Sequence, residues 1–431
     1  MGKKNKQKKL SDQNQPMPSY VAQKESGFKF TIGTLAVFCI VVLMIYANSL
    51  NSPFIWDDPY LVSDNHLVTS FKYLPDIFKH HLYYSTAGVS NFFRALQVLF
   101  LMFDYSVWKE NPFGYHLTSV IFHLLCGFLI FLIIDSLFGR RAVAFLVGLL
   151  FLVHPINSTV VDYIASRADS QVALFAMLSF WLFFKSLRRQ CGDRASLVYY
   201  LTSLFSFILA LLSKELGMIV PFLILVGYGA VSKNTDNFRQ PAPKKIIPFF
   251  VILAAYLFLR ATILNFSSPS SGMPPSLYAR LLTTAESFVR LIGLLFIPTK
   301  IHIEKGIPFS SGLFEPSTFI SLLILAAMGF LTYKARRVSA MSFFGLTWFF
   351  VALLPMANIV PINATIADHW LYLPCFGFLL AVIGGISDWL KEATGAKALV
   401  KKFALVFYAV VVILFSVLTV KQNTIWSDPI K

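Results

Sequence analysis

The stretch TIGTLAVFCIVVLMIYANS (residues 31–49) is followed closely by NSPFIWDDPY (residues 51–60), and the junction between the two decides the fold. The first stretch is long enough to cross a bilayer as a helix. The basic leader MGKKNKQKK (residues 1–9) ahead of it is expected to stay in the cytoplasm by the positive-inside rule. Asp57 and Asp58 would then emerge at the outer membrane surface, where adjacent acids point to function. A helix cap or a solvated turn would also explain the pair.

The composition is that of a polytopic membrane protein. The 431 residues are 56% hydrophobic and 13% charged, with a mean hydropathy of +0.67, whereas a soluble domain carries about 25% charged residues. The first apolar stretch is long for a signal peptide and no small-residue cleavage site follows it, so we expect a retained anchor. The four cysteines suggest neither a disulfide framework nor a metal site.

Hydropathy predicts an all-α polytopic membrane protein with the N-terminus inside and the C-terminus outside. A cytoplasmic leader (1–30) precedes a membrane domain (31–420) with two large outer loops, 50–113 and 266–315, and an outer tail (421–431) follows. The eleven expected spans are 31–49, 114–136, 142–160, 171–187, 197–213, 216–232, 246–265, 316–333, 339–357, 371–388 and 402–420.

The placement of charge supports this orientation. The predicted cytoplasmic segments contain 24 of the 37 Lys and Arg residues, and the outer segments contain 13. Inner loops that face anionic lipid also account for the net charge of +16 without a nucleic-acid partner, and the sequence shows no recognition module for nucleic acid.

Two outer segments are apolar without being expected to cross the membrane. Residues 91–103 form an amphipathic pattern typical of a helix lying on the membrane surface. Residues 280–298 are interrupted by Glu286 and Arg290, and a full crossing there would place the basic residues 334–337 outside. We therefore expect an interfacial or re-entrant helix over 280–298.

Polar residues collect at the outer ends of the predicted spans and could converge with the acidic pair on one outward cavity. Local explanations exist for several of them. Arg167 and Asp169 could form a local ion pair in the turn that caps the next span. Lys214 and Glu215 could extend their charged ends to the membrane interface, and His154 could be a helix-end histidine whose ring nitrogens are hydrogen-bonded within the protein. The residues considered are Arg94, His154, Arg167, Asp169, Lys214, Glu215, Asp368 and His369. His116 and His123, seven residues apart on one predicted helix face, are better explained by packing.

This set of side chains suits a particular chemistry. A carboxylate at a membrane surface can act as a general base towards a hydroxyl, and nearby Arg and Lys side chains can hold a phosphate. A donor made of a lipid tail, a phosphate and a sugar would use these parts. Attack at its anomeric carbon passes through an oxocarbenium-like state, and the phosphate leaves without protonation, so one base and cationic stabilisers suffice.

In this order the motifs resemble the GT-C integral-membrane glycosyltransferases that use polyprenyl-phosphate sugars. More narrowly, they resemble the membrane domain of the transmembrane and tetratricopeptide-repeat O-mannosyltransferases and their bacterial relatives. The matching pieces are FIWDD (54–58), FRAL (93–96), GYH (114–116) with His123, VHP (153–155), SRAD (166–169), LSKE (212–215) and ADHWLYLP (367–374).

The resemblance implies a GT-C fold in which Asp57 or Asp58 carries the catalytic carboxylate and the Arg167 and Lys214 regions lie near the donor phosphate. The full set expected to bind donor phosphate or substrate is Arg94, His154, Arg167, Asp169, Lys214, Glu215, Arg290, Asp368, His369 and Tyr372. Family members usually carry Arg where this chain has His369. The sequence also stops, after residues 424–431, about where the helical repeats would begin, which weakens the case for a protein acceptor and for mannose.

The sequence therefore predicts a glycosyltransferase that moves a sugar from a polyprenyl-phosphate donor to a hydroxyl of a protein or glycolipid on the outer face of the membrane. That membrane would be a bacterial inner membrane or the endoplasmic reticulum. No cofactor is expected beyond a weakly held divalent cation at Asp57 and Asp58. A lipid-linked-glycan flippase, a glycan ligase or polymerase, and a non-catalytic scaffold are the alternatives. A flippase would favour polar groups at the bilayer centre, where the predicted spans are mostly apolar.

Overall fold

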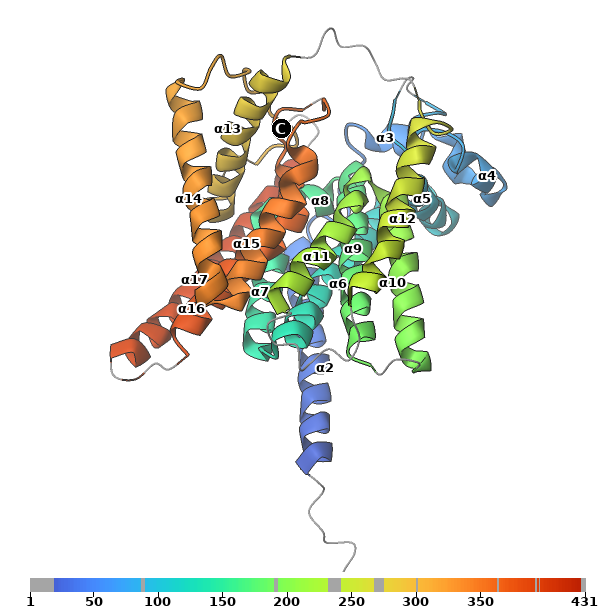
Figure 1. The fold of residues 1–431 in the computed structure, drawn as a ribbon. Helices are drawn as coiled ribbons and strands as arrows, with labels where there is room; N and C mark the ends of the chain where they lie inside the picture. The colour runs from blue at the N-terminus through green and yellow to red at the C-terminus, as the bar shows by residue number, and fades with distance from the viewer. Residues whose placement is uncertain are drawn as a thin grey trace, which may run out of the picture.

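The chain folds into a bundle of helices, seen in the computed structural model in Figure 1. The structure describes residues 19–86, 90–189, 193–231, 242–266, 275–299, 301–362, 364–391, 394 and 396–427. Within these ranges the only β pairing is an isolated bridge between Lys305 and Ile366, so the predicted all-α class is confirmed. Most of the basic leader and most of the loop 233–245 lie outside the described residues.

Each of the eleven predicted spans falls on a helical segment. The main helices of these segments are α2 (Ser19–Tyr46), α6 (Pro112–Phe138), α7 (Arg141–Val153), α9 (Arg167–Leu187), α10 (Arg194–Ser213), α11 (Val220–Val231), α12 (Ala242–Ala261), α14 (Pro316–Val338), α15 (Ala340–Leu353), α16 (Tyr372–Trp389) and α17 (Ala396–Trp426). Among the described residues, seven helices are long and apolar enough to cross a membrane, or eight if a bent pair counts as one span. The predicted number of eleven spans is not confirmed.

The predicted span 142–160 is not one continuous helix. Helix α7 ends at Val153, and the chain continues through the 3-10 turn η4 (Pro155–Asn157) into α8 (Ser158–Asp162), bent by 55° from α7. Pro155 causes the break because proline disfavours helical backbone in the residue before it, and His154 accordingly takes an extended conformation. After α8 the chain reaches the acidic pair, where the backbone N–H of Ala165 donates to the carboxylate of Asp58.

The loop 50–113, predicted to be an outer loop, folds into a cap of short helices at one end of the bundle, opposite the end from which the start of α2 projects (Figure 1). The cap comprises α3 (Asp58–Leu61), η2 (His66–Thr69), η3 (Phe71–Tyr73), α4 (Leu74–Ile77) and α5 (Ala95–Trp108). Helix α5 corresponds to the amphipathic helix predicted over 91–103. The cap has its own apolar core, which includes Leu61, Leu101 and Tyr115.

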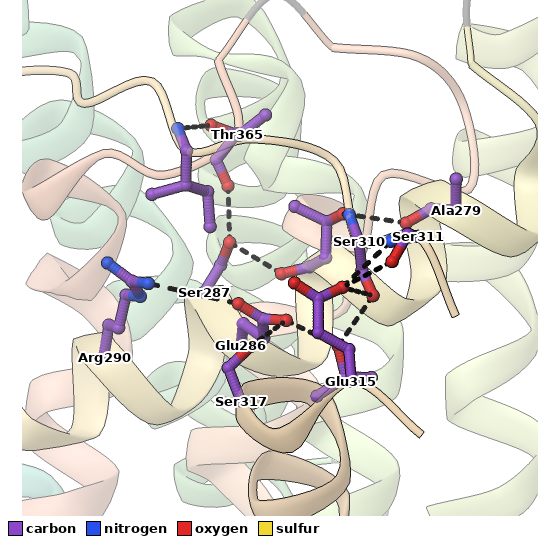
Figure 2. A network of polar contacts seen from close by, with 12 residues as sticks. Ala279, Glu286, Ser287, Arg290, Ser310, Ser311, Glu315, Ser317 and Thr365 are labelled. Carbon is purple, nitrogen blue, oxygen red and sulfur yellow. Dashed lines mark hydrogen bonds and ion pairs between the residues drawn. The ribbon is translucent and has the colours of Figure 1, made fainter. Parts of the chain in front are cut away.

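Helix α13 (Leu277–Phe296) covers the ambiguous segment 280–298 and is not among the helices able to span a membrane. Its polar face is tied into neighbouring loops, as Figure 2 shows. The buried Glu286 carboxylate accepts hydrogen bonds from Ser317 and Thr318 at the start of α14, and Ser287 donates to the carbonyl of Thr365. The charged residue that interrupts the apolar pattern is therefore an anchor for α13.

The centre of the bundle is formed by α9 and α16, the most buried of the apolar helices, whereas α14 and α17 expose most of their apolar surface. Helices α15 and α16 meet at Gly345 and Gly377. A Cβ atom added to Gly345 would lie 2.4 Å from the carbonyl oxygen of Gly377, so glycine permits this close approach. Helix α17 continues to Trp426, past the expected start of the tail at 421.

Candidate functional site

The two members of the acidic pair have different environments. Asp58 is fully buried, and its carboxylate accepts hydrogen bonds from the backbone N–H groups of Ile55 and Ala165 at 3.2 and 2.8 Å. Asp57 is exposed and precedes α3, but its side chain makes no capping hydrogen bond to that helix. Asp58 therefore joins the acidic loop to the segment before α9, while Asp57 presents its carboxylate to the outside of the fold.

Burial raises the pKa of Asp58 to about 7, although the two backbone hydrogen bonds and the nearby Arg167 favour its charged form. Desolvation dominates because a charged carboxylate loses its hydration when buried. At neutral pH this carboxyl is therefore close to half protonated. Its ionisation is therefore coupled to folding.

Asp57 is held by a tyrosine from the same loop. The hydroxyl of Tyr83 donates to Oδ2 of Asp57 at 3.1 Å. Burial and the charge of Asp57 raise the pKa of Tyr83 well above its usual value, so it remains a neutral donor. Tyr163, which precedes η5 (Ile164–Ser166), also interacts with the Asp57 carboxylate. The carboxylate is thus positioned while remaining accessible.

A charged cluster lies near Tyr83. Tyr83 interacts electrostatically with Asp57 and also with Arg94, which belongs to this cluster. The ammonium of Lys214 contacts both carboxylate oxygens of Asp169, at 2.7 and 2.8 Å, in a buried ion pair. Arg94, at the start of α5, lies 3.6 Å from the carboxylate of Glu215. We call Arg94, Asp169, Lys214, Glu215 and His369 the Arg94 cluster.

These five residues come from four separate parts of the chain, and the fold brings them together. Lys214 and Glu215 begin η6 (Glu215–Ile219) at the end of α10, and His369 lies in η9 (Asp368–Leu371) before α16. His369 is close enough to Asp169, Lys214 and Arg94 to interact electrostatically with all three. The fold thus brings this subset of the expected site residues together, and their location on the outer side stays a prediction.

The polar atoms of the Arg94 cluster do not satisfy one another. Three of its buried atoms have no hydrogen-bond partner: Nε of Arg94, Oε1 of Glu215 and Nδ1 of His369. Buried polar atoms in folded proteins are nearly always paired, with protein, water or ligand. Lys214 also uses only two of the three donors of its ammonium on Asp169. The cluster is suited to bind an additional polar group.

Arg167 lies elsewhere, behind the acidic pair. It is fully buried, forms an ion pair with Asp104, donates from Nε to Ser119 at 3.0 Å and donates to the carbonyl of Tyr115. These contacts join α9 to α5 and α6. In this arrangement the guanidinium is enclosed by protein and does not face the Arg94 cluster.

Four further candidates also have partners supplied by the protein. His154 accepts from the N–H of Ile156 and contacts the carbonyl of Leu295 at 3.1 Å, so both ring nitrogens are occupied by backbone. The carboxylate of Asp368 accepts from the backbone of His302 at 2.7 Å. Tyr372 bonds to His123 inside the bundle at 2.8 Å. Arg290 lies 4.0 Å from Glu286 on α13, in the network of Figure 2.

Three residues of the site were not selected from the sequence. Tyr83 and Tyr163 contact Asp57, and Arg260 at the end of α12 donates to the carbonyl of Asn91, close to Arg94. The only sequence signal for Tyr83 is its position in the aromatic stretch HLYY (81–84) of the outer loop. Nothing in the sequence distinguishes Arg260 from a helix-end anchor.

Among the described residues, no group of three or more His, Cys, Asp or Glu side chains is placed to hold a metal ion. Both oxygens of Asp58 accept backbone hydrogen bonds, and its side chain is buried whereas that of Asp57 is exposed. Asp57 is thus the carboxylate of the pair that a cation from solvent would reach.

Comparison with known families and proteins points in one direction. Residues 96–263 match the family described as dolichyl-phosphate-mannose-protein mannosyltransferase. The human protein O-mannosyl-transferase TMTC1 is 26% identical over 91% of this chain and 50% of its own length. The human protein O-mannosyl-transferase TMTC3 is 25% identical over 90% of this chain and 46% of its own. The chain thus spans about half the length of these relatives.

Two solved structures share the fold. One is the oligosaccharyltransferase of Archaeoglobus fulgidus, crystallised with a tethered acceptor peptide, with 15% identity and a TM-score of 0.51 over 91% of this chain and 55% of that one. The other is ArnT of Cupriavidus metallidurans bound to undecaprenyl phosphate, with 12% identity and a TM-score of 0.51 over 92% of this chain and 76% of that one.

These similarities define the class: the chain has the fold of the GT-C integral-membrane glycosyltransferases. Its sequence is similar, more narrowly, to that of the protein O-mannosyltransferases. The resemblance drawn from the motifs is confirmed. The family match contains Lys214 and Glu215 and begins after Asp57 and Arg94, so it does not assign the acidic loop.

Proposed function

We propose that this chain transfers a sugar from a polyprenyl-phosphate donor to an acceptor hydroxyl on the outer side of the membrane. The observation that carries the proposal is the juxtaposition of an exposed, positioned Asp57 and the incompletely satisfied Arg94 cluster, linked by Tyr83. The relatives' names favour mannose and a protein Ser or Thr acceptor, and a glycolipid acceptor remains the alternative.

In the proposed reaction Asp57 is the general base. Its carboxylate accepts the proton of the acceptor hydroxyl as that oxygen forms a bond to the anomeric carbon. The bond between this carbon and the phosphate oxygen breaks, and the electron pair leaves with the polyprenyl phosphate. Tyr83 and Tyr163 orient the carboxylate. Asp58 holds the loop in place through its two backbone hydrogen bonds, and because it is fully buried it does not reach the acceptor hydroxyl.

The leaving phosphate gathers negative charge, and we assign its stabilisation to Arg94 with Lys214. Nε of Arg94 lacks a hydrogen-bond partner, and Lys214 has a third donor beyond those that contact Asp169. Charge-assisted hydrogen bonds to phosphate are among the strongest in proteins. The similar fold of ArnT, which was crystallised with undecaprenyl phosphate, supports a donor of this class.

The test is transfer by the purified protein from polyprenyl-phosphate mannose to a Ser/Thr peptide or a glycolipid. Asp57→Asn should lower turnover by roughly 10²–10⁴-fold, the usual contribution of a general base, and should leave donor binding unchanged. Asp64→Asn is the matched control, since Asp64 is an exposed acid in the same loop. Full turnover by Asp57→Asn would remove Asp57 from the reaction.

The outward orientation needs its own test. Asp76 is a partly exposed residue of the cap, and Lys391 is exposed after α16. Cysteines placed at these two positions should react differently with a membrane-impermeant thiol reagent added to intact cells, position 76 being labelled and position 391 protected. The reverse pattern would place the proposed site on the cytoplasmic side.

A further inference from the structure

Trp56, the residue before Asp57, has an unusual backbone conformation. Its φ angle is +52°, in the left-handed region that bulky side chains rarely adopt. Residues held in such conformations cluster at functional sites, where the surrounding fold maintains the strain. Trp56 and Asp57 are adjacent and both exposed, so this strained turn presents the two side chains at the surface.

The Trp56 side chain is also more exposed than the two aromatic rings next to it. It is 57% exposed, while its neighbours Tyr163 and Trp426 are each 5% exposed. Tyr163 and Trp426 stack nearly parallel, with centroids 5.9 Å apart and an angle of 11°. Trp56 meets each of them at a steep angle, 73° and 70°, with centroids 6.0 Å apart. The buried pair therefore supports Trp56 without covering it by parallel stacking.

The supporting pair joins the end of α17 to the segment between α8 and η5. Trp426 ends α17, Tyr163 follows α8, and both belong to the apolar core of the cap. Tyr163 also interacts with the Asp57 carboxylate. The carboxylate is thus linked through Tyr83 to the cations and through Tyr163 to an exposed indole.

We propose that Trp56 is a stacking platform for a pyranose ring bound at Asp57, supported by Tyr163 and Trp426. A pyranose has one face of C–H groups and a rim of hydroxyls. An exposed indole matches the apolar face, and the adjacent carboxylate and phenols match the hydroxyls. The inference rests on the proposed glycosyl transfer and assigns a specificity-determining residue to it. The ring belongs either to the donor's sugar or to a sugar on the acceptor.

The location of the strain separates this role from that of an ordinary interfacial tryptophan. Tryptophans are common at membrane surfaces, and such an anchor needs no left-handed backbone. Glycine adopts this conformation without strain. Trp56→Gly should therefore keep or raise the thermal midpoint while losing the platform, whereas loss of a structural or anchoring side chain would lower that midpoint.

Binding of polyprenyl phosphate with and without an attached mannose should be measured for the parent, Trp56→Ala, Trp56→Gly and Trp389→Ala. Trp389 is the matched control because it is 59% exposed at the far end of α16. If the ring is the donor's, both Trp56 variants should bind the mannose-bearing lipid roughly three- to tenfold more weakly and bind the bare phosphate like the parent. If the ring is the acceptor's, donor binding should be unchanged and KM should rise for a glycolipid acceptor but not for a peptide.

Tryptophan emission on addition of methyl α-mannoside tests the platform without any donor. A spectral change that occurs in the parent and in Trp389→Ala but not in Trp56→Ala would support the platform. This result would stand even if the parent transferred no sugar, because a lack of transfer would count against the proposed function and not against the platform. Equal weakening of both lipids in the Trp56 variants would overturn the platform in favour of a lipid contact. Parent-like behaviour of these variants with lipids, glycolipid acceptor and mannoside would also overturn it.

Discussion

The Arg94 cluster and the network of Figure 2 contain the same kinds of side chains, but they use them differently. In the network, the carboxylates of Glu286 and Glu315 accept hydrogen bonds from serine and threonine side chains. In the cluster, Arg94 and Glu215 approach to only 3.6 Å, and each keeps a buried atom without a hydrogen-bond partner. Polar groups that satisfy one another stabilise a fold, whereas a buried polar atom without a partner is an exception that calls for an explanation, which the proposed donor phosphate would supply in the cluster.

Arg167 extends this comparison, because it is a buried arginine whose partners are all supplied by protein. Arg167→Met should lower the free energy of unfolding by about 3–5 kcal/mol, since it leaves the Asp104 carboxylate buried without its partner. Arg94→Met should change the free energy of unfolding far less. Denaturation of both variants in detergent measures the difference. A normally folded Arg167→Met with weakened donor binding would instead place Arg167 on the phosphate.

Asp58 should make stability depend on pH. Its pKa is raised to about 7 in the folded protein from an ordinary value of 3.8. Between these values the folded protein holds a proton that the unfolded chain has lost, so the free energy of unfolding falls as the pH rises. The slope is at most about 1.4 kcal/mol per pH unit. Asp58→Asn should lack this contribution, so the thermal midpoint of the parent should fall relative to that of the variant from about pH 4 to about pH 7. Parallel curves would contradict the assignment.

Arg94→Met should weaken binding of a polyprenyl-phosphate sugar by roughly 10- to 100-fold, because a hydrogen bond to a charged group contributes about 1.5–3 kcal/mol. Arg290→Met is the control, since Arg290 is a half-exposed arginine paired with Glu286 on α13. Isothermal titration or photo-crosslinking with the donor would measure the change. Equal weakening in both variants would indicate a general effect of positive charge.

The smallest effect is expected in the satisfied network. Ser317→Ala removes one hydrogen bond, of 3.0 Å, to the Glu286 carboxylate, which keeps its bond from Thr318. The free energy of unfolding should fall by about 0.5–1.5 kcal/mol, and donor binding should be unchanged. Reduced donor affinity in Ser317→Ala would mean that the network and the Arg94 cluster are coupled.

The sequence by itself determined the class of this protein. Apolar stretches of sufficient length predict membrane helices, and every predicted span coincides with a helical segment. The motif order predicted the GT-C resemblance, since motifs are local properties of the chain. The break at His154 was missed, although Pro155 is its local cause.

Only the tertiary structure decided which polar residues form the site. Asp57 and Asp58 are adjacent in sequence, yet one is exposed and the other accepts a hydrogen bond from Ala165, a residue 107 positions away. Arg94 and Arg167 cannot be distinguished by residue type. Arg94 lies among buried polar atoms that lack hydrogen-bond partners, whereas Arg167 is enclosed by protein and paired with Asp104. Burial and partners depend on contacts between distant segments, and those contacts, rather than the residue type, determine whether a charge supports the fold or remains available to a substrate.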